Sequence, residues 1–389
     1  MFTPSRIELC RAALRSNIRF LKRIIGPSTR YSSVIKGNAY GHGITHFVPL
    51  AESCGVEHFS VFSADEALTA IESRTREETR VMIMGAIDDA ELEWAVENDI
   101  AFWIFDLDRL EAASRAAGRV EKPARIHLEV ETGLNRTGLE LDELSRVLQR
   151  IRAEPEHFRI EGLCTHYAGA ESQANYLRIQ RQIQRFFEAS VHLTDAGLDL
   201  PPRHSACSAA AMVYPQTRME MCRFGIMQYG LWPSLEVWMD FLQQRSDSGH
   251  PRSHDPLRRV MRWSSRVMGI KTVEQGQHVG YGTSYLTTRR ERLAAVPVGY
   301  SHGFARDLSN LGHVLVRGKR AGVVGLVNMN AIMIDVTHIP GVTRGDEVVL
   351  IGKQGRAQVT VSSFSDLIRN VNYEVLVRLP SEIPRVVVD

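Results

Sequence analysis

The segment Tyr31–Gly43, with the sequence YSSVIKGNAYGHG, indicates how this chain folds. It begins with a short apolar run that is typical of a buried strand and continues into Lys36. A lysine directly after a parallel strand presents its amine at the carboxyl end of that strand, which is the catalytic face of a (β/α)8 barrel. Gly37, Gly41 and Gly43 allow the backbone to approach a ligand closely. The alternative is a surface lysine before a flexible loop.

The sequence around this segment alternates strand and helix patterns from about residue 30 to about residue 225. The strand candidates are Tyr31–Ile35, His58–Phe62, Arg80–Met84, Ala101–Phe105, Ile126–Val130, Ile160–Thr165, Arg203–Ser205 and a short run ending near Arg223. The helix candidates between them are Ile44–Cys54, Ala64–Ser73, Asp88–Glu97, Asp106–Ala117, Leu141–Ile151 and Ser172–Asp195. This α/β alternation predicts a TIM barrel over residues 11–242, rather than an open doubly wound sheet.

A change of composition marks a second domain. Residues 243–258, QQRSDSGHPRSHDPLR, are polar and contain two prolines, which predicts a linker or surface loop. The β-rich runs beyond it are Val260–Val273, Arg292–Val298, His313–Val316, Ala331–Val336, Glu347–Ile351 and Gln358–Val361. We therefore expect a C-terminal all-β domain over residues 259–389, with residues 1–10 forming an N-terminal strand that packs with it.

Composition limits the partners of the chain. The net charge of +2, from 47 basic and 45 acidic residues, provides no overall field that would hold a nucleic acid or an anionic membrane. The first residues contain no long apolar run, and the five cysteines are scattered without CxxC spacing. We expect a cytoplasmic protein without a metal site, a membrane span or a disulfide framework.

The lysine segment resembles the cofactor-lysine segment of alanine racemases, in which the lysine forms a Schiff base with pyridoxal 5'-phosphate. Further motifs similar to those of that family follow in the same order: Glu129–Gly138, Thr165–Tyr167, His204–Ser208, Arg223–Met227, Val279–Tyr285, Pro297–Tyr300, Asn328–Asn330 and Asn372–Val375. The motifs of the first domain also lie at predicted strand ends, a context that a chance match would not need to satisfy.

The resemblance implies a PLP-dependent racemase that interconverts L- and D-alanine with two bases. Removing the Cα proton and returning it on the other face requires one base on each side. The implied bases are Lys36 and Tyr281, the latter supplied by the partner subunit of a homodimer with shared active sites. The implied cofactor-binding residues are Lys36, Tyr40, His166, Ser208, Arg223, Gly225, Ile226 and Tyr373. The implied substrate-binding residues are Arg136, Met329 and Tyr300.

Glu129 departs from the family pattern, because many of these racemases carry a carbamylated lysine there. We expect Glu129 to supply the negative charge that holds Arg136; the alternative is an inward glutamate paired elsewhere. Glu131, two residues on, is expected on the same strand face. Four other positions also depart from the family: His302, Asn328, Asn330 and Cys207 replace aspartate, cysteine, aspartate and asparagine.

These departures leave alternative functions open. One is a racemase for another or a broader set of amino acids. A decarboxylase of the same architecture is less favoured, because such enzymes typically place a carboxylate against the pyridine nitrogen, where this chain has Arg223. A single-domain PLP carrier would lack the β-domain predicted here.

Overall fold

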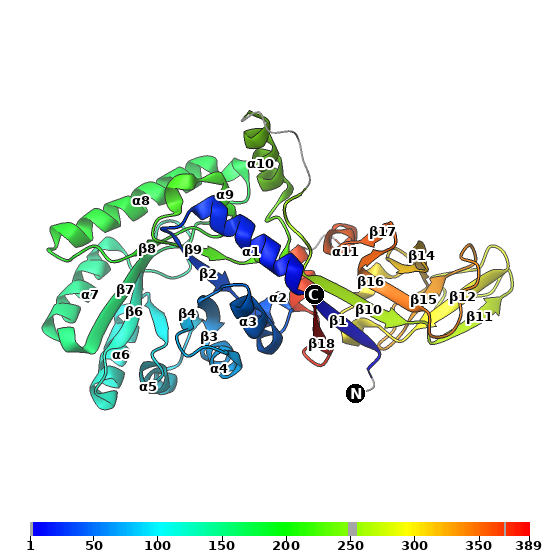
Figure 1. The fold of residues 1–389 in the computed structure, drawn as a ribbon, viewed down its shortest axis with the longest axis horizontal. Coiled ribbons are helices and arrows are strands. Elements are labelled where there is room, and N and C mark those ends of the chain that lie inside the picture. The colour runs from blue at the N-terminus through cyan, green and yellow to red at the C-terminus, as the bar shows by residue number, and fades with distance from the viewer. Residues whose placement is uncertain (1–2, 248–254, 369–370) are drawn as a thin grey trace. The chain divides into compact units, whose positions relative to one another are not determined.

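The computed structural model describes residues 3–247, 255–368 and 371–389. The chain divides into two compact units (Figure 1). We call Ala13–Lys36 with Val48–Arg258 the barrel unit, and Met1–Ala12, Gly37–Phe47 and Arg259–Asp389 the β unit. The expected boundaries differ from this division at Gly37–Phe47, which groups with the β unit although it lies within the predicted barrel.

The barrel unit is built on a parallel sheet that closes on itself. Its strands are β2 (Arg30–Val34), β3 (His58–Ser63), β4 (Arg80–Ala86), β5 (Ala101–Ile104), β6 (Ala124–Glu129), β7 (Phe158–Cys164), β8 (Arg203–His204) and β9 (Met221–Phe224). Within the described residues they pair in the order β8-β7-β6-β5-β4-β3-β2-β9. The backbone N–H of Arg223 donates to the carbonyl of Ala206 at 3.0 Å, which joins β9 to the end of β8. The predicted barrel is confirmed.

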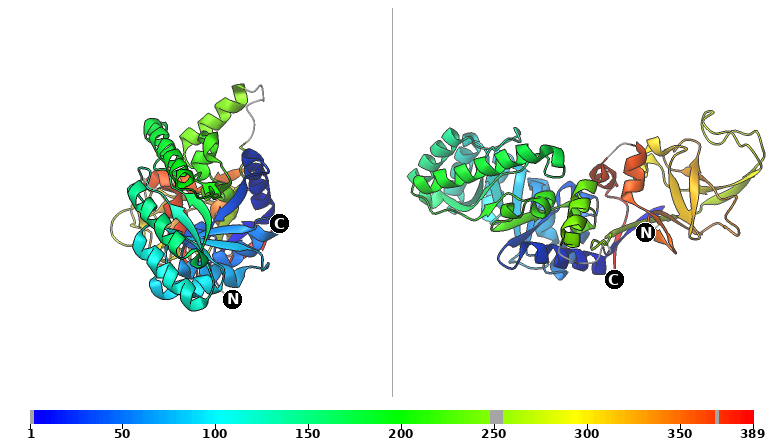
Figure 2. Two further views of the ribbon diagram at one scale, coloured as in Figure 1. Left: turned by 90° about the vertical axis from the view of Figure 1, so that its left-hand side faces the viewer. Right: turned by 90° about the horizontal axis from the view of Figure 1, so that it is seen from above.

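Helices cover the outside of this sheet (Figure 2). They are α1 (Arg11–Ile25), α3 (Ile44–Ser53), α4 (Ala64–Ser73), α5 (Asp89–Glu97), α6 (Leu107–Val120), α7 (Leu141–Ala153), α8 (Tyr176–Asp195) and α9 (Ser208–Val213). A further helix, α10 (Leu235–Asp247), packs against α9. The amphipathic pattern explains their packing: α7, for example, buries Leu144, Val147, Leu148 and Ile151 at helical spacing. Across the described part of the chain, no helix is long and apolar enough to cross a membrane.

The predicted linker at residues 243–258 is shorter in the structure. Residues 243–247 continue the helix α10, whose bounds are Leu235–Asp247. Residues 248–254 lie outside the described residues. The polar composition of 243–247 suits the end of an exposed helix as well as a loop, so composition alone could not place this boundary.

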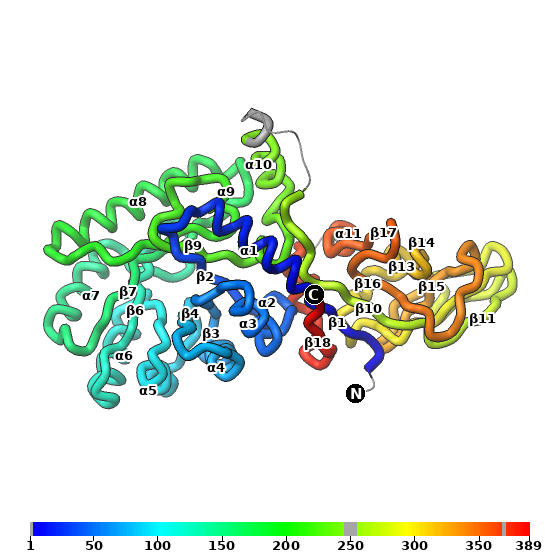
Figure 3. The backbone as a smooth tube through the Cα atoms, in the orientation of Figure 1, coloured from blue at the N-terminus to red at the C-terminus, as the bar shows by residue number. Residues whose placement is uncertain are grey.

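The β unit contains a mixed sheet. Its strands are β1 (Ser5–Cys10), β10 (Met261–Arg266), β11 (Gly269–Val273), β12 (Glu291–Val296), β13 (His313–Val316), β14 (Lys319–Val324), β15 (Ile332–Asp335), β16 (Glu347–Gln354), β17 (Ala357–Val359) and β18 (Arg385–Val388). β1 runs antiparallel to β10 and parallel to β18. Figure 3 shows β1 beside both of these strands. The sequence patterns did not predict β14, β18 or the short helices α11 (Val361–Ile368) and α12 (Asn372–Val377).

Candidate active site at the carboxyl end of the barrel

Lys36 follows β2, and its position is fixed by the hydrogen bonds of the preceding residues. The carbonyl of Val34 accepts from Gln228 Nε2 at 2.8 Å and from Tyr229 Oη at 2.9 Å. The N–H of Ile35 donates to Ser60 O at 2.9 Å. Desolvation, followed by the charge of Arg136, lowers the pKa of the Lys36 ammonium. A lowered pKa increases the fraction of neutral amine, which is the nucleophilic form.

The residues after Lys36 form a left-handed turn, labelled α2 (Lys36–Tyr40) in Figure 1. Five consecutive residues, Gly37 to Gly41, have φ values of 62, 51, 54, 50 and 74°. L-residues rarely adopt this conformation in succession. At Gly41 a Cβ atom would lie 2.0 Å from the carbonyl oxygen of Leu376. The close approach we expected of this glycine is therefore made to the protein's own backbone, within the β unit.

Arg223 is buried at the end of β9 and is held through both terminal nitrogens. Nη1 donates to His204 O at 2.7 Å and lies 2.5 Å from His204 Nδ1. Nη2 donates to Thr165 O at 2.7 Å and to Ser205 O at 3.3 Å. Within the described residues, Nε has no hydrogen-bond partner. This arrangement fixes the guanidinium plane and leaves one N–H available to a ligand.

Sequence reasoning missed the histidines that support Arg223. Since arginine only donates, His204 Nδ1 accepts, and its Nε2–H then donates to His127 Nδ1 at 2.9 Å. Burial and the charge of Arg223 lower the pKa of both histidines, that of His127 to about 3, so both rings are neutral. Gly162 lies between them, where a Cβ atom would be 2.3 Å from His127 Nδ1 and 3.0 Å from His204 Nε2. One sequence signal could have found this pair: His127 on β6 and His204 on β8 lie on the two strands that flank β7, which carries Gly162.

Ser208, Gly225 and Ile226 gather beside the ends of β8 and β9. The backbone N–H of Gly225 donates to Ser208 Oγ at 3.1 Å. The N–H of Ile226 has no hydrogen-bond partner among the residues that the structure describes. Because β9 pairs with β2, with Phe224 opposite Ser33, these groups follow the strand next to the one that precedes Lys36. A hydroxyl and a free backbone amide are donors suited to an oxyanion.

His166 and Arg136 also belong to the barrel unit. Both follow barrel strands, His166 after β7 and Arg136 in the loop after β6. The pKa of His166 is lowered to about 3 by desolvation, and next by the charges of Arg223, Lys36 and Arg136. His166 is therefore a neutral ring among cations at neutral pH.

Glu129 is buried at the end of β6, where its carboxylate accepts from Thr137 Oγ1 at 2.8 Å. Burial raises its pKa, while the Thr137 bond and the charge of Arg136 lower it. No ion pair joins Glu129 to Arg136 within the described residues, so Arg136 acts on it through charge at longer range. Glu131 does not share the strand face of Glu129 as expected, because β6 ends at Glu129. Its carboxylate accepts hydrogen bonds from the backbone N–H groups of Gly133 and Asn135 in the loop that follows.

The other predicted residues lie in the β unit. Tyr40 is buried, with its ring centroid 5.8 Å from that of Tyr373. Tyr281 lies in the loop between β11 and β12, flanked by glycines of positive φ, and is 74% exposed. Tyr300 and Met329 belong to adjoining loops: the N–H of Tyr300 donates to Asn328 O at 3.0 Å. Each of these aromatic or apolar side chains except Tyr40 and Tyr373 is exposed on this unit.

The barrel has a strand-end lysine of lowered pKa beside a buried arginine, and a β-rich unit follows the barrel in the chain. These features define an enzyme whose chemistry uses a nucleophilic amine. Comparisons with known proteins give the family. Residues 9–233 match the model "Alanine racemase, N-terminal domain", and residues 260–387 match "Alanine racemase, C-terminal domain". The chain belongs to the alanine racemase family.

Individual relatives match this chain over nearly its full length. An alanine racemase of Leptospira interrogans is 33% identical over 99% of this chain and 96% of its own. One from Symbiobacterium thermophilum is 35% identical over 98% of this chain and 96% of its own. The solved structure of alanine racemase from Streptomyces coelicolor has a TM-score of 0.89 and 29% identity, covering 99% of this chain and 98% of that one.

Proposed function

We propose that this protein interconverts L- and D-alanine, with pyridoxal 5'-phosphate held by Lys36 at the carboxyl end of the barrel. The observation that carries the proposal is the Lys36 amine, whose pKa is lowered by desolvation and by Arg136 in a chain of this family. The departures at His302, Asn328, Asn330 and Cys207 leave both proposed bases, Lys36 and Tyr281, in place, so they bear on the choice of amino acid rather than on the reaction.

The groups present fit this cofactor. The amine of Lys36 suits its aldehyde, the Nε–H of Arg223 suits a ring nitrogen, and the Ser208 hydroxyl with the amide of Ile226 suits a phosphate. We assign the cofactor to Lys36, Tyr40, His166, Ser208, Arg223, Gly225, Ile226 and Tyr373. Pyridoxal phosphate, when bound, supplies the electron sink that makes the Cα proton of an amino acid acidic.

The protein's own residues then move the proton. We assign Lys36 and Tyr281 as the bases on opposite faces of the substrate, because one fixed base cannot reach both faces. Arg136 and the loop of Met329 contact the substrate carboxylate, and Tyr300 lies at the substrate entrance. Arg223 is a permanent cation held by three carbonyl oxygens, so it opposes protonation of any nitrogen it faces. Keeping that nitrogen unprotonated weakens the electron sink. This favours rapid return of the proton to the substrate Cα over side reactions.

The proposal predicts a specific outcome for L-alanine in D2O. The protein should lose the optical rotation of the substrate while deuterium enters at Cα, because the proton exchanges with solvent at the two bases. Polarimetry and mass spectrometry measure the two effects. Release of CO2 would instead indicate a decarboxylase, and absence of both exchange and CO2 a cofactor carrier; either result contradicts the proposal. A chiral screen of other L-amino acids identifies the preferred substrate.

Glu129→Gln should weaken substrate binding with little effect on cofactor content. Glutamine keeps the acceptor for Thr137 Oγ1 but removes the negative charge that acts on Arg136. We expect KM for alanine to rise about tenfold, the effect of losing one modest charge interaction. Thr137→Val is the matched control, because it removes the hydrogen bond and keeps the charge. An unchanged KM in Glu129→Gln would show that Glu129 does not hold Arg136.

Assembly and location complete the proposal. We propose a C2 homodimer in which Tyr281 of the partner subunit faces Lys36, since an aromatic side chain that is 74% exposed at a loop tip suits a contact with another chain. The cytoplasmic location remains a prediction.

A further inference from the structure

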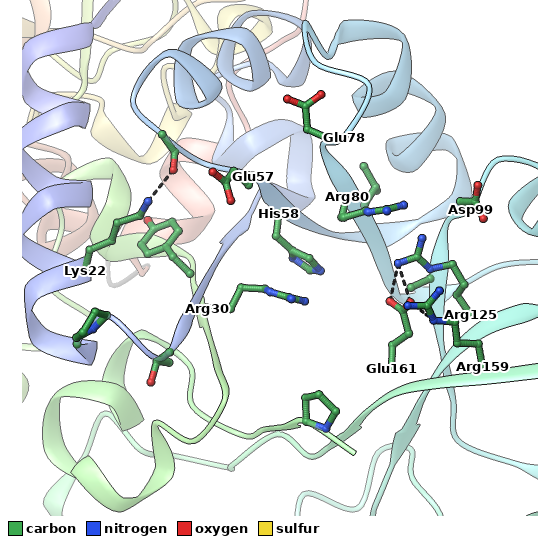
Figure 4. A pocket seen from close by; sticks show the side chains of 18 of the residues that line it. Lys22, Arg30, Glu57, His58, Glu78, Arg80, Asp99, Arg125, Arg159 and Glu161 are labelled. Atoms are coloured by element: carbon green, nitrogen blue, oxygen red, sulfur yellow. Dashed lines mark hydrogen bonds and ion pairs between the residues drawn. The ribbon is translucent and has the colours of Figure 1, made fainter. Parts of the chain in front are cut away.

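A large cavity lies at the amino-terminal mouth of the barrel, at the opposite end of the strands from Lys36. Its volume is about 1050 Å³. Arginines at or near the starts of four strands line it: Arg30 of β2, Arg80 of β4, Arg125 of β6 and Arg159 of β7. Figure 4 shows Arg30 extending across the cavity and Arg80 pointing toward the side of Arg125.

These arginines are only partly neutralised. Arg125 and Arg159 share a single carboxylate, that of Glu161, at 2.7 and 3.2 Å. Arg30 and Arg80 form no ion pair within the described residues. The Nε of Arg125 is buried and has no hydrogen-bond partner in that part of the chain. Four guanidinium groups therefore face one carboxylate.

The other acids of the cavity do not balance this charge. Asp99 already pairs with Lys122 at 2.8 Å. In Figure 4, Glu57 points toward the side of Lys22, and Glu78 lies on the far rim from Arg30. The excess positive charge is therefore concentrated among the four arginines.

A neutral histidine lies beside them. Figure 4 shows the ring of His58 pointing into the cavity. Burial, followed by the charges of His127 and Arg30, lowers its pKa to about 3. Its Nδ1 is 2.9 Å from Ser32 Oγ, which fixes the ring. His58 can thus exchange a hydrogen bond with a ligand without adding charge.

We propose that this cavity is a second binding site, which takes a small multivalent oxyanion bearing phosphate or several carboxylates. Arginine forks pair bidentately with both groups, and the volume suits a small molecule rather than a single ion. The strand rise places this mouth about 20 Å from Lys36, so its occupant does not compete with the substrate.

Calorimetric titration of the protein, saturated with pyridoxal phosphate, tests the proposal. Inorganic pyrophosphate is the probe in one arm and citrate in the other, with acetate as the monovalent control. We expect one molecule bound per chain in at least one arm and no detectable binding of acetate. The arm that binds distinguishes a phosphate ligand from a polycarboxylate.

Variants locate the site. Arg30→Gln and Arg80→Gln should each weaken binding at least about tenfold, the loss of one charge-assisted contact. Glu161→Gln should strengthen binding, because it removes the only carboxylate that the arginines share. Arg320→Gln, at an exposed arginine of β14, is the matched control and should change nothing. Binding in neither arm, or binding that the Arg30 and Arg80 variants leave unaltered, would overturn the proposal.

Discussion

Replacement of Lys36 by alanine is expected to abolish racemisation and the visible absorbance of the bound cofactor together. The variant loses both the amine that holds the cofactor and the base on one face of the substrate. We expect activity to fall by at least about 10³-fold, toward the upper limit for a single general base. Chiral chromatography measures the rate, and absorbance spectra measure cofactor attachment. Lys319→Ala, at an exposed lysine of β14, should behave as wild type.

Chemical reduction gives an independent test of the same lysine. Borohydride should fix the cofactor irreversibly on the wild-type protein, and peptide mapping should find it on the peptide that contains Lys36. The Lys36 amine is favoured over surface lysines because desolvation and Arg136 lower its pKa. Label on another lysine would refute the assignment of Lys36, even in a protein that racemises alanine.

Mixed dimers are expected to regain activity from two inactive variants. Lys36→Ala and Tyr281→Phe proteins, each nearly inactive, are unfolded together and refolded as a mixture. If Tyr281 serves the site of the other subunit, each hybrid dimer has one site with both defects and one intact site. With random pairing, half of the dimers are hybrids and half of their sites are whole, so about a quarter of wild-type activity should return.

The exposure of Tyr281 motivates this experiment. Its side chain is 74% exposed at the tip of a loop, held between Gly280 and Gly282 at φ values of 74 and 69°. Differently tagged variants allow hybrid dimers to be isolated and counted. If confirmed hybrids remain inactive, each site is built within one chain and the shared site is wrong. Each variant refolded alone provides the background rate.

Much of the fold follows from local sequence patterns. The predicted strand Tyr31–Ile35 differs from β2 (Arg30–Val34) by one residue at each end, and His313–Val316 matches β13. Apolar runs and helical spacing reflect which side chains face the core, and neighbours in the sequence are sufficient to show them. β14 was missed because it starts with two charged residues, Lys319 and Arg320, which are not typical of a buried strand. Its apolar second half is buried only through pairing with β13 and β15.

The lysine, the arginine and the order of the motifs could likewise be found in the sequence, because each motif is a short continuous segment. Tertiary structure alone decided what surrounds them. The hydrogen bond between His204 and His127 joins residues 77 apart in the sequence. It requires a glycine at position 162, because a Cβ atom there would collide with the His127 ring. The four arginines of the cavity at the amino-terminal mouth of the barrel come from four separate strands. Such groups meet only because barrel closure sets the register of distant strands, and no local pattern records that register.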